Sequence, residues 1–211
     1  MPLPDFLVNR YKDWRSTSFK KKEKSFIDSI KNKQKPKAMI ISCCDSRVLE
    51  TNIFDGKVGD FFIHKNIANL VKEYNLRTEN NCTASAIEYA IKELNVPHIV
   101  ILGHSNCGGI KYVYDVCCNK QNQKKYEFIY EWVKNIQEPY NNLPTELNEK
   151  NKIELLEKES IKLSIKNLYT YPFIKKLIDI KSLEVHGLWY DIAKGKLFYL
   201  NIKTNNFEEV V

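Results

Sequence analysis

The sequence lacks features that would assign it to several common classes of protein. No stretch of its 211 residues approaches about eighteen consecutive apolar residues, so a membrane-spanning helix is not expected. Residues 1–6 lack the basic and apolar halves of a secretory signal. There is no Cys-x-x-Cys pair of the thioredoxin type, which argues against a thiol redox protein, and no internal repeat is visible. We therefore expect a cytoplasmic protein that makes no membrane contact.

Charge does not indicate a nucleic-acid partner. The 33 Lys and Arg residues outnumber the 26 Asp and Glu residues, which gives a formal net charge of +7. Short basic runs occur at residues 20–22 and 124–125, but most Lys residues alternate with Glu along the chain. No nucleic-acid recognition motif accompanies them. We interpret the basic residues as a solvated surface.

The cysteines do not form the pattern of a disulfide framework. There are six, but Cys43-Cys44 and Cys117-Cys118 are adjacent pairs in a chain without an export signal. Metal-binding or buried thiols in a reducing cytoplasm are the better interpretation. We expect four of them to be packing thiols, namely Cys44, Cys82, Cys117 and Cys118.

Hydrophobic periodicity predicts a single α/β domain over residues 1–211, with a mainly parallel sheet flanked by helices and a helical N-terminal arm over residues 1–33. Strands are expected at 38–43, 59–63 and 98–103, with a hairpin of 183–192 and 197–202 around Lys194-Gly195. Helices are expected at 83–94, from Gly108 onward, and at 153–168 and 172–180. Residues 118–150, which are rich in Asn, Lys and Gln, predict only short helices and surface loops.

Two thiols and an imidazole follow two of the predicted strands. Cys43 closes the apolar run 38–42, and His104 follows the apolar run 98–102, with Cys107 three residues later. The carboxyl ends of parallel strands meet at one edge of a sheet. Two Cys and one His are the ligands of a catalytic zinc site that keeps its fourth position open for water. A Cys after a strand is more often a small buried hydrophobe, but here both halves follow matched strands. We therefore predict one zinc ion held by Cys43, His104 and Cys107.

Asp45 and Arg47 follow the first ligand at spacings of two residues. If the chain is extended there, Asp45 shares a face with Cys43 and Arg47 holds it. A carboxylate clamped by a guanidinium stays ionised and fixed in position. A zinc-bound water has its pKa lowered to about 7, which gives a hydroxide nucleophile at neutral pH. We predict that Asp45 and Arg47 are a catalytic pair that orients this hydroxide; the alternative is an ordinary surface ion pair.

These motifs carry a family resemblance. Cys-x-Asp-Ser-Arg at 43–47 and Gly-His-Ser-x-Cys-Gly-Gly at 103–109 resemble the β-class carbonic anhydrases. Further matching stretches lie at 62–69, 85–90 and 186–192, so the resemblance spans roughly residues 34–200 in order. It implies a zinc-dependent lyase that hydrates carbon dioxide reversibly to bicarbonate and a proton. It also implies a homodimer or homotetramer, whose N-terminal helices embrace the partner and whose active site draws groups from both chains.

The resemblance also implies a substrate pocket and a gate. The pocket residues would be Gln34, whose amide donates to substrate oxygen, then Phe62, Ile67, Tyr89 and Gly108. Without the resemblance, core packing is the better interpretation of the three apolar side chains. In the family, breaking the Asp–Arg pair lets the Asp become the fourth zinc ligand and close the site.

This sequence departs from the family at two positions. Lys65 stands where the family usually has Arg, and Ile40 stands where some bacterial members have a Trp that helps bind inhibitory bicarbonate. Lys does not replace Arg as a bidentate donor, so we do not expect that second site here in its familiar form.

Two other functions stay open on the sequence alone. One is hydrolysis of carbon disulfide on the same fold, because the zinc hydroxide would be common to both reactions. The other is a non-catalytic zinc module, against which Asp45 and Arg47 argue, because a closed structural site needs a fourth Cys or His.

Overall fold

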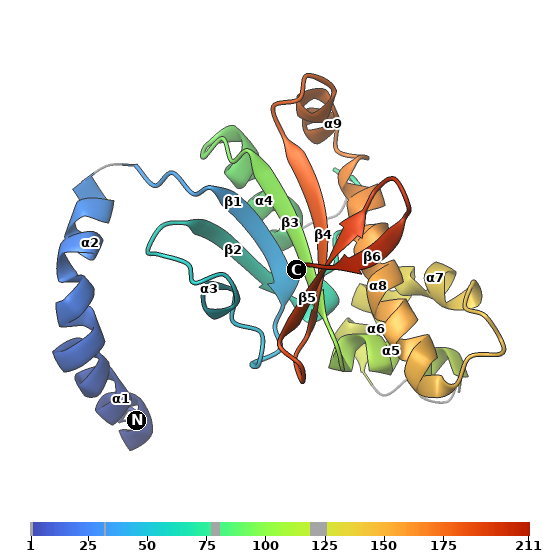
Figure 1. The fold of residues 1–211 in the computed structure, drawn as a ribbon, viewed down its shortest axis with the longest axis horizontal. Helices are drawn as coiled ribbons and strands as arrows, with labels where there is room; N and C mark the ends of the chain where they lie inside the picture. Colours follow the sequence, from blue (N-terminus) through green and yellow to red (C-terminus); the bar gives the residue numbers. More distant parts are fainter. Residues whose placement is uncertain (1, 32, 77–80, 119–125) are drawn as a thin grey trace.

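A six-stranded sheet forms the centre of the computed structural model, which describes residues 2–31, 33–76, 81–118 and 126–211 (Figure 1). The strand order is β2-β1-β3-β4-β5-β6. In chain order the strands are β1 (Ala38–Cys43), β2 (Phe61–Asn66), β3 (His98–His104), β4 (Glu184–Asp191), β5 (Lys196–Asn201) and β6 (Asn206–Glu209). The first four are parallel to one another, whereas β5 and β6 continue the sheet as antiparallel strands.

Strand β1 lies at the middle of the parallel part and is buried along its whole length. Its register pairs Cys43 with Asn66 of β2, and Ser42 with Leu102 of β3. A parallel strand covered on both faces needs a nearly continuous apolar sequence, and Ala-Met-Ile-Ile-Ser-Cys supplies one. This register brings the carboxyl ends of β1 and β3 to the same edge of the sheet.

Helices cover the sheet unequally. Helices α4 (Cys82–Lys92), α8 (Glu149–Leu168) and α9 (Pro172–Asp179) bury their apolar residues in one large core against β1, β3 and β4. The opposite face has a smaller core near the short helix α3 (Glu50–Ile53). A third core lies around α5 (Gly108–Cys118) and includes side chains from α6 (Glu127–Val133) and from α8. The remaining short helices are η2 (Ile67–Asn69), η4 (Lys134–Ile136) and α7 (Gln137–Asn141).

Helix α8 packs on β3 at a position where that strand has a glycine. A Cβ atom added to Gly103 would lie 2.7 Å from Cδ1 of Ile161, which is closer than real side chains approach. The glycine therefore lets Ile161 of α8 pack directly on the backbone of β3, and a larger residue there would require the Ile161 side chain to shift. The glycine immediately precedes His104, so it also fixes where α8 runs relative to the end of the strand.

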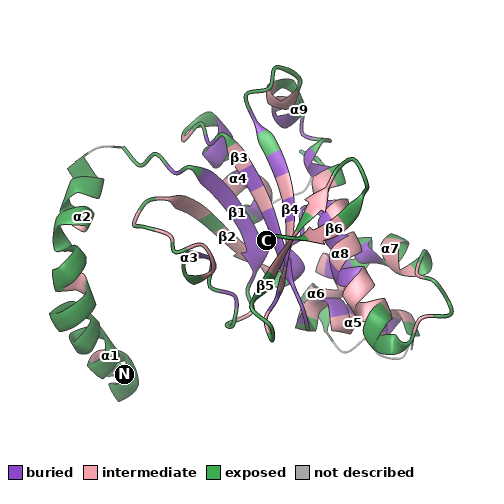
Figure 2. Cartoon of the chain, viewed as in Figure 1, coloured by how far each residue is buried: buried purple, intermediate pink, exposed green. Residues whose placement is uncertain are grey.

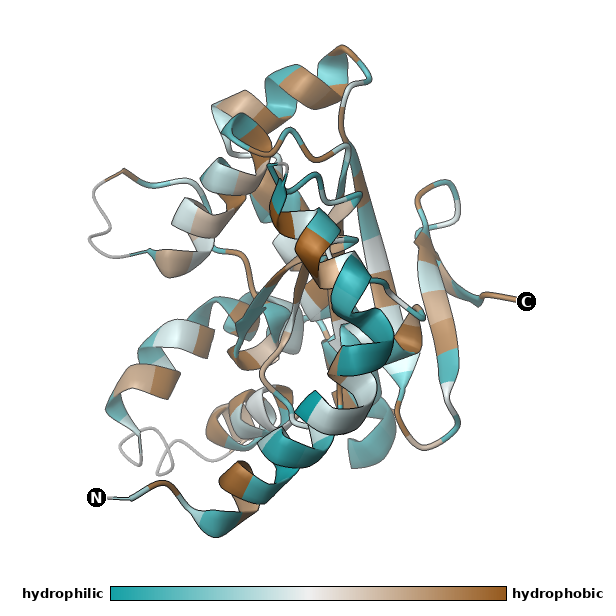
Figure 3. Cartoon of the chain, turned by 90° about the vertical axis from the view of Figure 1, so that its left-hand side faces the viewer, coloured by the Kyte–Doolittle hydropathy of each residue, from teal (hydrophilic) through white to brown (hydrophobic). Residues whose placement is uncertain are grey.

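The N-terminal helices stand apart from the sheet. Helix α1 (Asp5–Trp14), a short π-helical segment η1 (Arg15–Phe19) and α2 (Lys20–Lys31) contain no buried residue (Figure 2). They still carry large apolar side chains, and these alternate with polar ones along the arm (Figure 3). Phe6, Tyr11, Trp14 and Ile30, for example, are between 42% and 81% exposed.

Most of the predicted elements are confirmed, with differences at their ends. The strand predicted at 59–63 is β2 at Phe61–Asn66, so it begins two residues later and ends three residues later than predicted. Helix α3 and strand β6 were not predicted. Residues 126–150 form short helices and loops as expected, and residues 119–125 lie outside the described part of the chain. None of the described helices is both long and apolar enough to cross a membrane.

Candidate metal centre and active site

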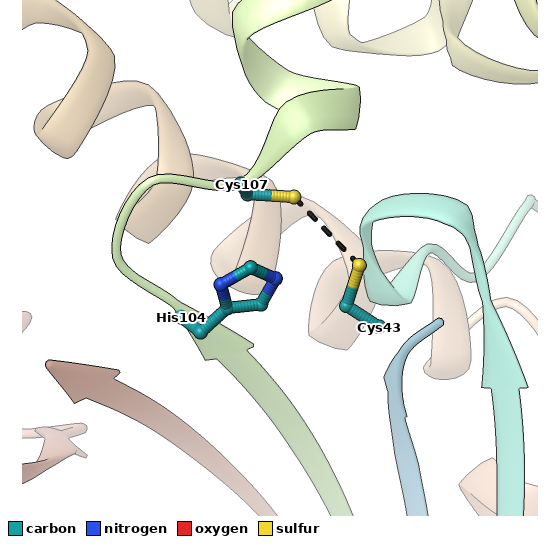
Figure 4. A group of neighbouring side chains, drawn as sticks. All are labelled: Cys43, His104 and Cys107. Carbon is teal, nitrogen blue, oxygen red and sulfur yellow. Dashed lines mark hydrogen bonds between the residues drawn. The ribbon is translucent and has the colours of Figure 1, made fainter. Parts of the chain in front are cut away.

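Cys43, His104 and Cys107 come together at the carboxyl edge of the parallel sheet (Figure 4). Cys43 ends β1, His104 ends β3, and Cys107 directly precedes α5. All three are buried, with exposed fractions between 1% and 4%. The two sulfur atoms lie 3.8 Å apart.

A tight turn returns the chain from His104 to the site. Asn106 has a φ of 57°, in the left-handed region that Asn tolerates better than most residues. Gly109 then allows the start of α5 to approach η2, because an added Cβ atom would lie 2.7 Å from Cγ2 of Ile67. The turn and the glycine together place the Cys107 thiol beside Cys43.

His104 is oriented so that one ring nitrogen has no protein partner. Its Nδ1 lies 2.9 Å from the carbonyl oxygen of Ser105, so Nδ1 carries the proton and donates. The other nitrogen, Nε2, is buried and accepts no hydrogen bond from any residue that the structure describes. A buried nitrogen lone pair without a partner is costly, and a metal ion would satisfy it.

The two thiols differ in acidity. The pKa of Cys43 falls well below its usual range, chiefly because Cys107 donates a hydrogen bond to it. The pKa of Cys107 rises for the same reason, with burial adding to the effect. Burial would lower the pKa of His104, but the neighbouring Cys43 thiolate and the carbonyl oxygen of Ser105 raise it overall. The pocket thus already favours one thiolate before any metal enters.

The donor set fits zinc. Two sulfurs that each lie about 2.3 Å from one tetrahedral zinc ion are about 3.8 Å apart, which is the separation of the two thiols here. The third donor is the free Nε2 of His104. Among the described residues, no fourth Cys or His joins this group, so the site is open as a catalytic one would be.

Asp45 and Arg47 form a bidentate ion pair beside the thiols. Nε of Arg47 donates to Oδ1 of Asp45 at 2.9 Å, and Nη2 donates to Oδ2 at 2.7 Å. Nη2 also lies 3.3 Å from the carbonyl oxygen of Asn106, in the turn that precedes Cys107. The hydrogen bonds from Arg47 hold the pKa of Asp45 well below its usual range, so the carboxylate is ionised at neutral pH.

The local backbone differs from the extended segment that we expected after Cys43. The chain turns at Ser46 and Arg47, and the backbone N–H of Arg47 donates to Oδ1 of Asp45 at 3.0 Å. The turn lets both the backbone N–H and the guanidinium of Arg47 donate to the same carboxylate. The pairing of Asp45 and Arg47 was therefore predicted correctly, but the backbone geometry that produces it was not.

Glu157 of α8 contacts the site and was missed by sequence reasoning. Its Oε1 accepts the backbone N–H of Cys107 at 3.0 Å, and its Oε2 accepts Nε1–H of Trp189 at 3.1 Å. Burial raises the pKa of Glu157 to about 7, against the opposing effect of these two donors. Its only signal in the sequence is a charged residue inside an amphipathic helix, which does not distinguish it from its neighbours.

The five predicted pocket residues do not all lie at the metal end of the sheet. Ile67 and Gly108 lie at the metal end, in η2 and at the start of α5. Phe62 and Tyr89 stack on each other, with ring centroids 5.9 Å apart, but Phe62 pairs with Met39, roughly 13 Å back along the strand from the metal edge. Gln34 is exposed in the segment before β1. One chain therefore does not bring all five residues to the thiols.

Lys65 already has partners on its own chain. Its Nζ donates to Oε1 of Glu50 at 2.7 Å and to the carbonyl oxygen of Val48 at 2.8 Å. Oε1 of Glu50, itself buried, also accepts the hydroxyl of Ser42. Ile40 is 1% exposed and belongs to the core. The two positions at which the chain departs from the family are thus used for packing and for a local ion pair.

The expectation that four cysteines are packing thiols was wrong for three of them. All six cysteines are free, but Cys44, Cys82 and Cys118 are exposed and only Cys117 is partly buried. Cys44 follows a fully buried strand, and its backbone N–H donates to the carbonyl oxygen of Asn66. Its thiol is exposed and does not belong to the group of three candidate ligands.

The fold and the donor set define a class before any comparison is made: an α/β protein with a candidate open Cys₂His metal site at the carboxyl edge of a parallel sheet. A family model described as carbonic anhydrase matches residues 38–197. The chain is 34% identical over 188 residues to β carbonic anhydrase 3 of Arabidopsis thaliana, in an alignment that covers 87% of this chain and 72% of that protein.

Solved structures agree with this match. The β-carbonic anhydrase CcaA superposes with a TM-score of 0.88 at 27% identity, covering 97% of this chain and 91% of that one. One of two tetrameric β-carbonic anhydrases from the ascomycete Sordaria macrospora superposes with a TM-score of 0.76 at 28% identity, covering 93% and 95%. The chain belongs to the β-class carbonic anhydrase family, a family of enzymes.

Proposed function

We propose that this protein hydrates carbon dioxide reversibly to bicarbonate and a proton, using one Zn²⁺ ion held by Cys43, His104 and Cys107. The observation that carries the proposal is an open three-donor set with a clamped, ionised carboxylate beside it. A structural zinc site would close the fourth position with another Cys or His. Here the neighbouring group is an Asp–Arg pair, which suits a catalytic role.

Zinc, when bound, lowers the pKa of a coordinated water from about 15.7 toward about 7 and so supplies a nucleophile at neutral pH. The three ligands carry the charge of two thiolates, which suits a divalent ion. The Glu157 carboxylate accepts a hydrogen bond from the backbone N–H of Cys107. The carbonyl oxygen of Ser105 accepts one from Nδ1 of His104 and so fixes the tautomer of that ring. Such supporting contacts orient the ligands and tune the ion.

Asp45 is the group that we propose to position the nucleophile. Its Oδ1 receives two hydrogen bonds from Arg47, whereas Oδ2 receives one. Oδ2 therefore keeps a lone pair that can accept a hydrogen bond from the attacking hydroxide and so direct the hydroxide's lone pair at the substrate. Arg47 prevents the carboxylate from turning toward the thiols and from taking up a proton itself.

We propose that the active site is completed by a second copy of the chain in a dimer or tetramer. Phe62, Tyr89 and Gln34 lie away from the thiols of their own chain, and an apolar substrate needs an apolar wall near the metal. The arm from α1 to α2 exposes apolar side chains to solvent, as expected of a segment that packs on a partner. The related protein from Sordaria macrospora is tetrameric.

The free thiols suit the reducing cytoplasm that we propose as the location.

Metal analysis combined with stopped-flow hydration of carbon dioxide tests the proposal. We expect one catalytic zinc ion per chain and hydration that is lost when the zinc is removed and restored when it is returned. Zinc bound at full occupancy without hydration would contradict the enzymatic proposal and favour a non-catalytic module. Turnover of carbon disulfide in place of carbon dioxide would keep the metal site and contradict the substrate.

A further inference from the structure

A second group of metal-binding side chains lies at the other end of the sheet. His98 opens β3 and Glu184 opens β4, and these two residues pair directly in the register of the two parallel strands. His186, two residues later on β4, projects from the same face as Glu184 because side chains alternate along a strand. Nδ1 of His98, Nε2 of His186 and Oε2 of Glu184 converge there. The active-site proposal assigns none of these residues a role.

The three distances are those of ligands that share one ion. Nε2 of His186 lies 3.3 Å from Nδ1 of His98, and Oε2 of Glu184 lies 3.5 Å and 3.6 Å from these two nitrogens. Nitrogen and oxygen ligands that lie about 2.0–2.2 Å from a tetrahedral zinc ion are about 3.3–3.6 Å apart. The triangle of donor atoms therefore matches one face of a zinc tetrahedron.

Direct bonding between the side chains explains this triangle less well. The two imidazole nitrogens can share a hydrogen bond at 3.3 Å, but the carboxylate oxygen, at 3.5 Å and 3.6 Å, lies beyond the usual length of about 2.7–3.2 Å. Two of the three atoms are imidazole nitrogens, and two imidazoles with a carboxylate are a known ligand set of zinc sites that keep an open position.

The group is accessible and rigidly placed. The side chains of His98, Glu184 and His186 are 42%, 65% and 43% exposed, so an ion can enter from solvent. The donors stand on neighbouring strands whose backbones are hydrogen-bonded throughout this region, and the backbone N–H of Glu184 also donates to the carbonyl oxygen of Pro97. Sites built on strands hold their donors more precisely than sites on loops.

We propose that His98, Glu184 and His186 form a second site for a divalent metal ion, with zinc as the ion that the donor geometry fits. The site lies at the amino ends of β3 and β4, near α9, whereas the Cys43 site lies at their carboxyl ends, near α5 (Figure 1). It is independent of catalysis. Binding would tie the first residue of β3 to β4, and so would stabilise the folded chain.

The test uses the full-length protein with its first zinc in place. After equilibrium dialysis against buffered free Zn²⁺ at slightly alkaline pH, elemental analysis should find close to two zinc ions per chain. The double variant His98→Asn/His186→Asn should retain one. Glu184→Gln should weaken the second binding step at least about tenfold, by comparison with effects measured at supporting residues of metal sites. Glu209→Gln, which changes an exposed carboxylate on β6, is the matched control and should bind as the wild type does.

Cobalt gives a readout that distinguishes the two sites. Co²⁺ at the Cys43 site should show thiolate charge-transfer absorption, whereas Co²⁺ at the second site should show only the weaker bands of nitrogen and oxygen ligands. These weaker bands should disappear in the double variant while the thiolate absorption persists. A single zinc ion per wild-type chain would overturn the proposal, and so would a second ion bound equally tightly by the double variant. Hydration of carbon dioxide should be the same in all these variants.

Discussion

Strand β3 begins with His98 and ends with His104, and each histidine belongs to a different group of candidate metal ligands. The two groups can therefore be compared on one strand. At its carboxyl end, His104 is buried with two thiols, and its ring is fixed by a backbone carbonyl. At its amino end, His98 is half-exposed beside an imidazole and a carboxylate. The first group has supporting contacts from α8 and from a tight turn, whereas the second has only its two strands. Burial and support, rather than the number of donors, distinguish a catalytic centre from a surface site.

The largest effect is expected from removing a buried ligand. Cys107→Ala should lose both zinc and carbon dioxide hydration, because the two remaining donors leave the ion without the geometry that the site provides. Zinc content and stopped-flow rates measured on the same sample check this. The matched control is Cys117→Ala. Cys117 lies near the far end of α5, so this variant should retain both zinc and activity. Full zinc occupancy in Cys107→Ala would show that the ligand is wrongly assigned.

Removing the carboxylate clamp should leave the metal and reduce the rate. Asp45→Asn should keep zinc and lower turnover at least about a hundredfold, the lower end of what proton-handling groups contribute. Arg47→Ala should lose a comparable factor, since it releases Asp45. Because the two residues act as one device, the double variant should lose little more than either single variant. Near-normal turnover in Asp45→Asn would refute its role, and additive losses would refute the pairing.

Acid should separate the two ends of β3. An imidazole with an ordinary pKa near 6.5 loses roughly tenfold in metal affinity between about pH 7.5 and about pH 5.5. Burial lowers the pKa of His186, which means that this ring keeps its lone pair to lower pH, so the second site should lose at most about a hundredfold. The Cys43 site should lose more, because Cys43 and burial raise the pKa of Cys107, and a thiol that must release its proton to bind zinc loses about tenfold in affinity per pH unit. The raised pKa of His104 adds to this loss. Zinc titrations at both pH values check this difference, and equal losses at both sites would contradict it.

A smaller effect is expected from the support behind Cys107. Glu157→Gln replaces one acceptor oxygen with an amide NH₂ that faces an N–H donor, which should cost about 1–3 kcal/mol of folding free energy. It should also release zinc about tenfold faster. Glu154→Gln, one turn earlier on α8, is the control because the Glu154 side chain is 43% exposed and its carboxylate pairs with Lys158 instead of with the backbone of Cys107. Denaturant unfolding and competition with a chelator measure both quantities. Equal behaviour of the two variants would leave Glu157 without a positioning role.

The smallest expected effect concerns inhibition by bicarbonate, for which we expect no separate binding site. Lys65 is held by Glu50 and Val48, and Ile40 is buried. We therefore expect bicarbonate at slightly acid pH to inhibit only by competing as the product. A titration of activity with bicarbonate should show no cooperativity. Cooperative inhibition that is weakened in Lys65→Ala would reveal an anion site that these contacts do not suggest.

The sequence predicted the features that a single segment determines, and it missed those that depend on how distant segments pack together. The three ligands follow strands that are themselves apolar runs, so their meeting at one sheet edge could be inferred from the chain order. Glu157 could not be predicted, because it lies fifty residues beyond Cys107, and helical periodicity gives no sign of which face reaches the site. The group at His98 depends on the register of β3 against β4, which neither strand specifies alone. The end of β2 was misplaced because its last residues are polar, although they pair with β1.

The unburied arm at the start of the chain has a consequence for the lifetime of the protein. The arm runs as one helical stretch from Asp5 to Lys31, and no side chain of α1 or α2 is buried in its own chain. Helices in proteins draw most of their stability from tertiary packing, so in a lone chain we expect the arm to be the first part to unwind and the first that a protease cuts. If a second copy packs on the arm, as we propose, a newly made chain would become durable on assembly, and its degradation would be fastest where copies are scarce.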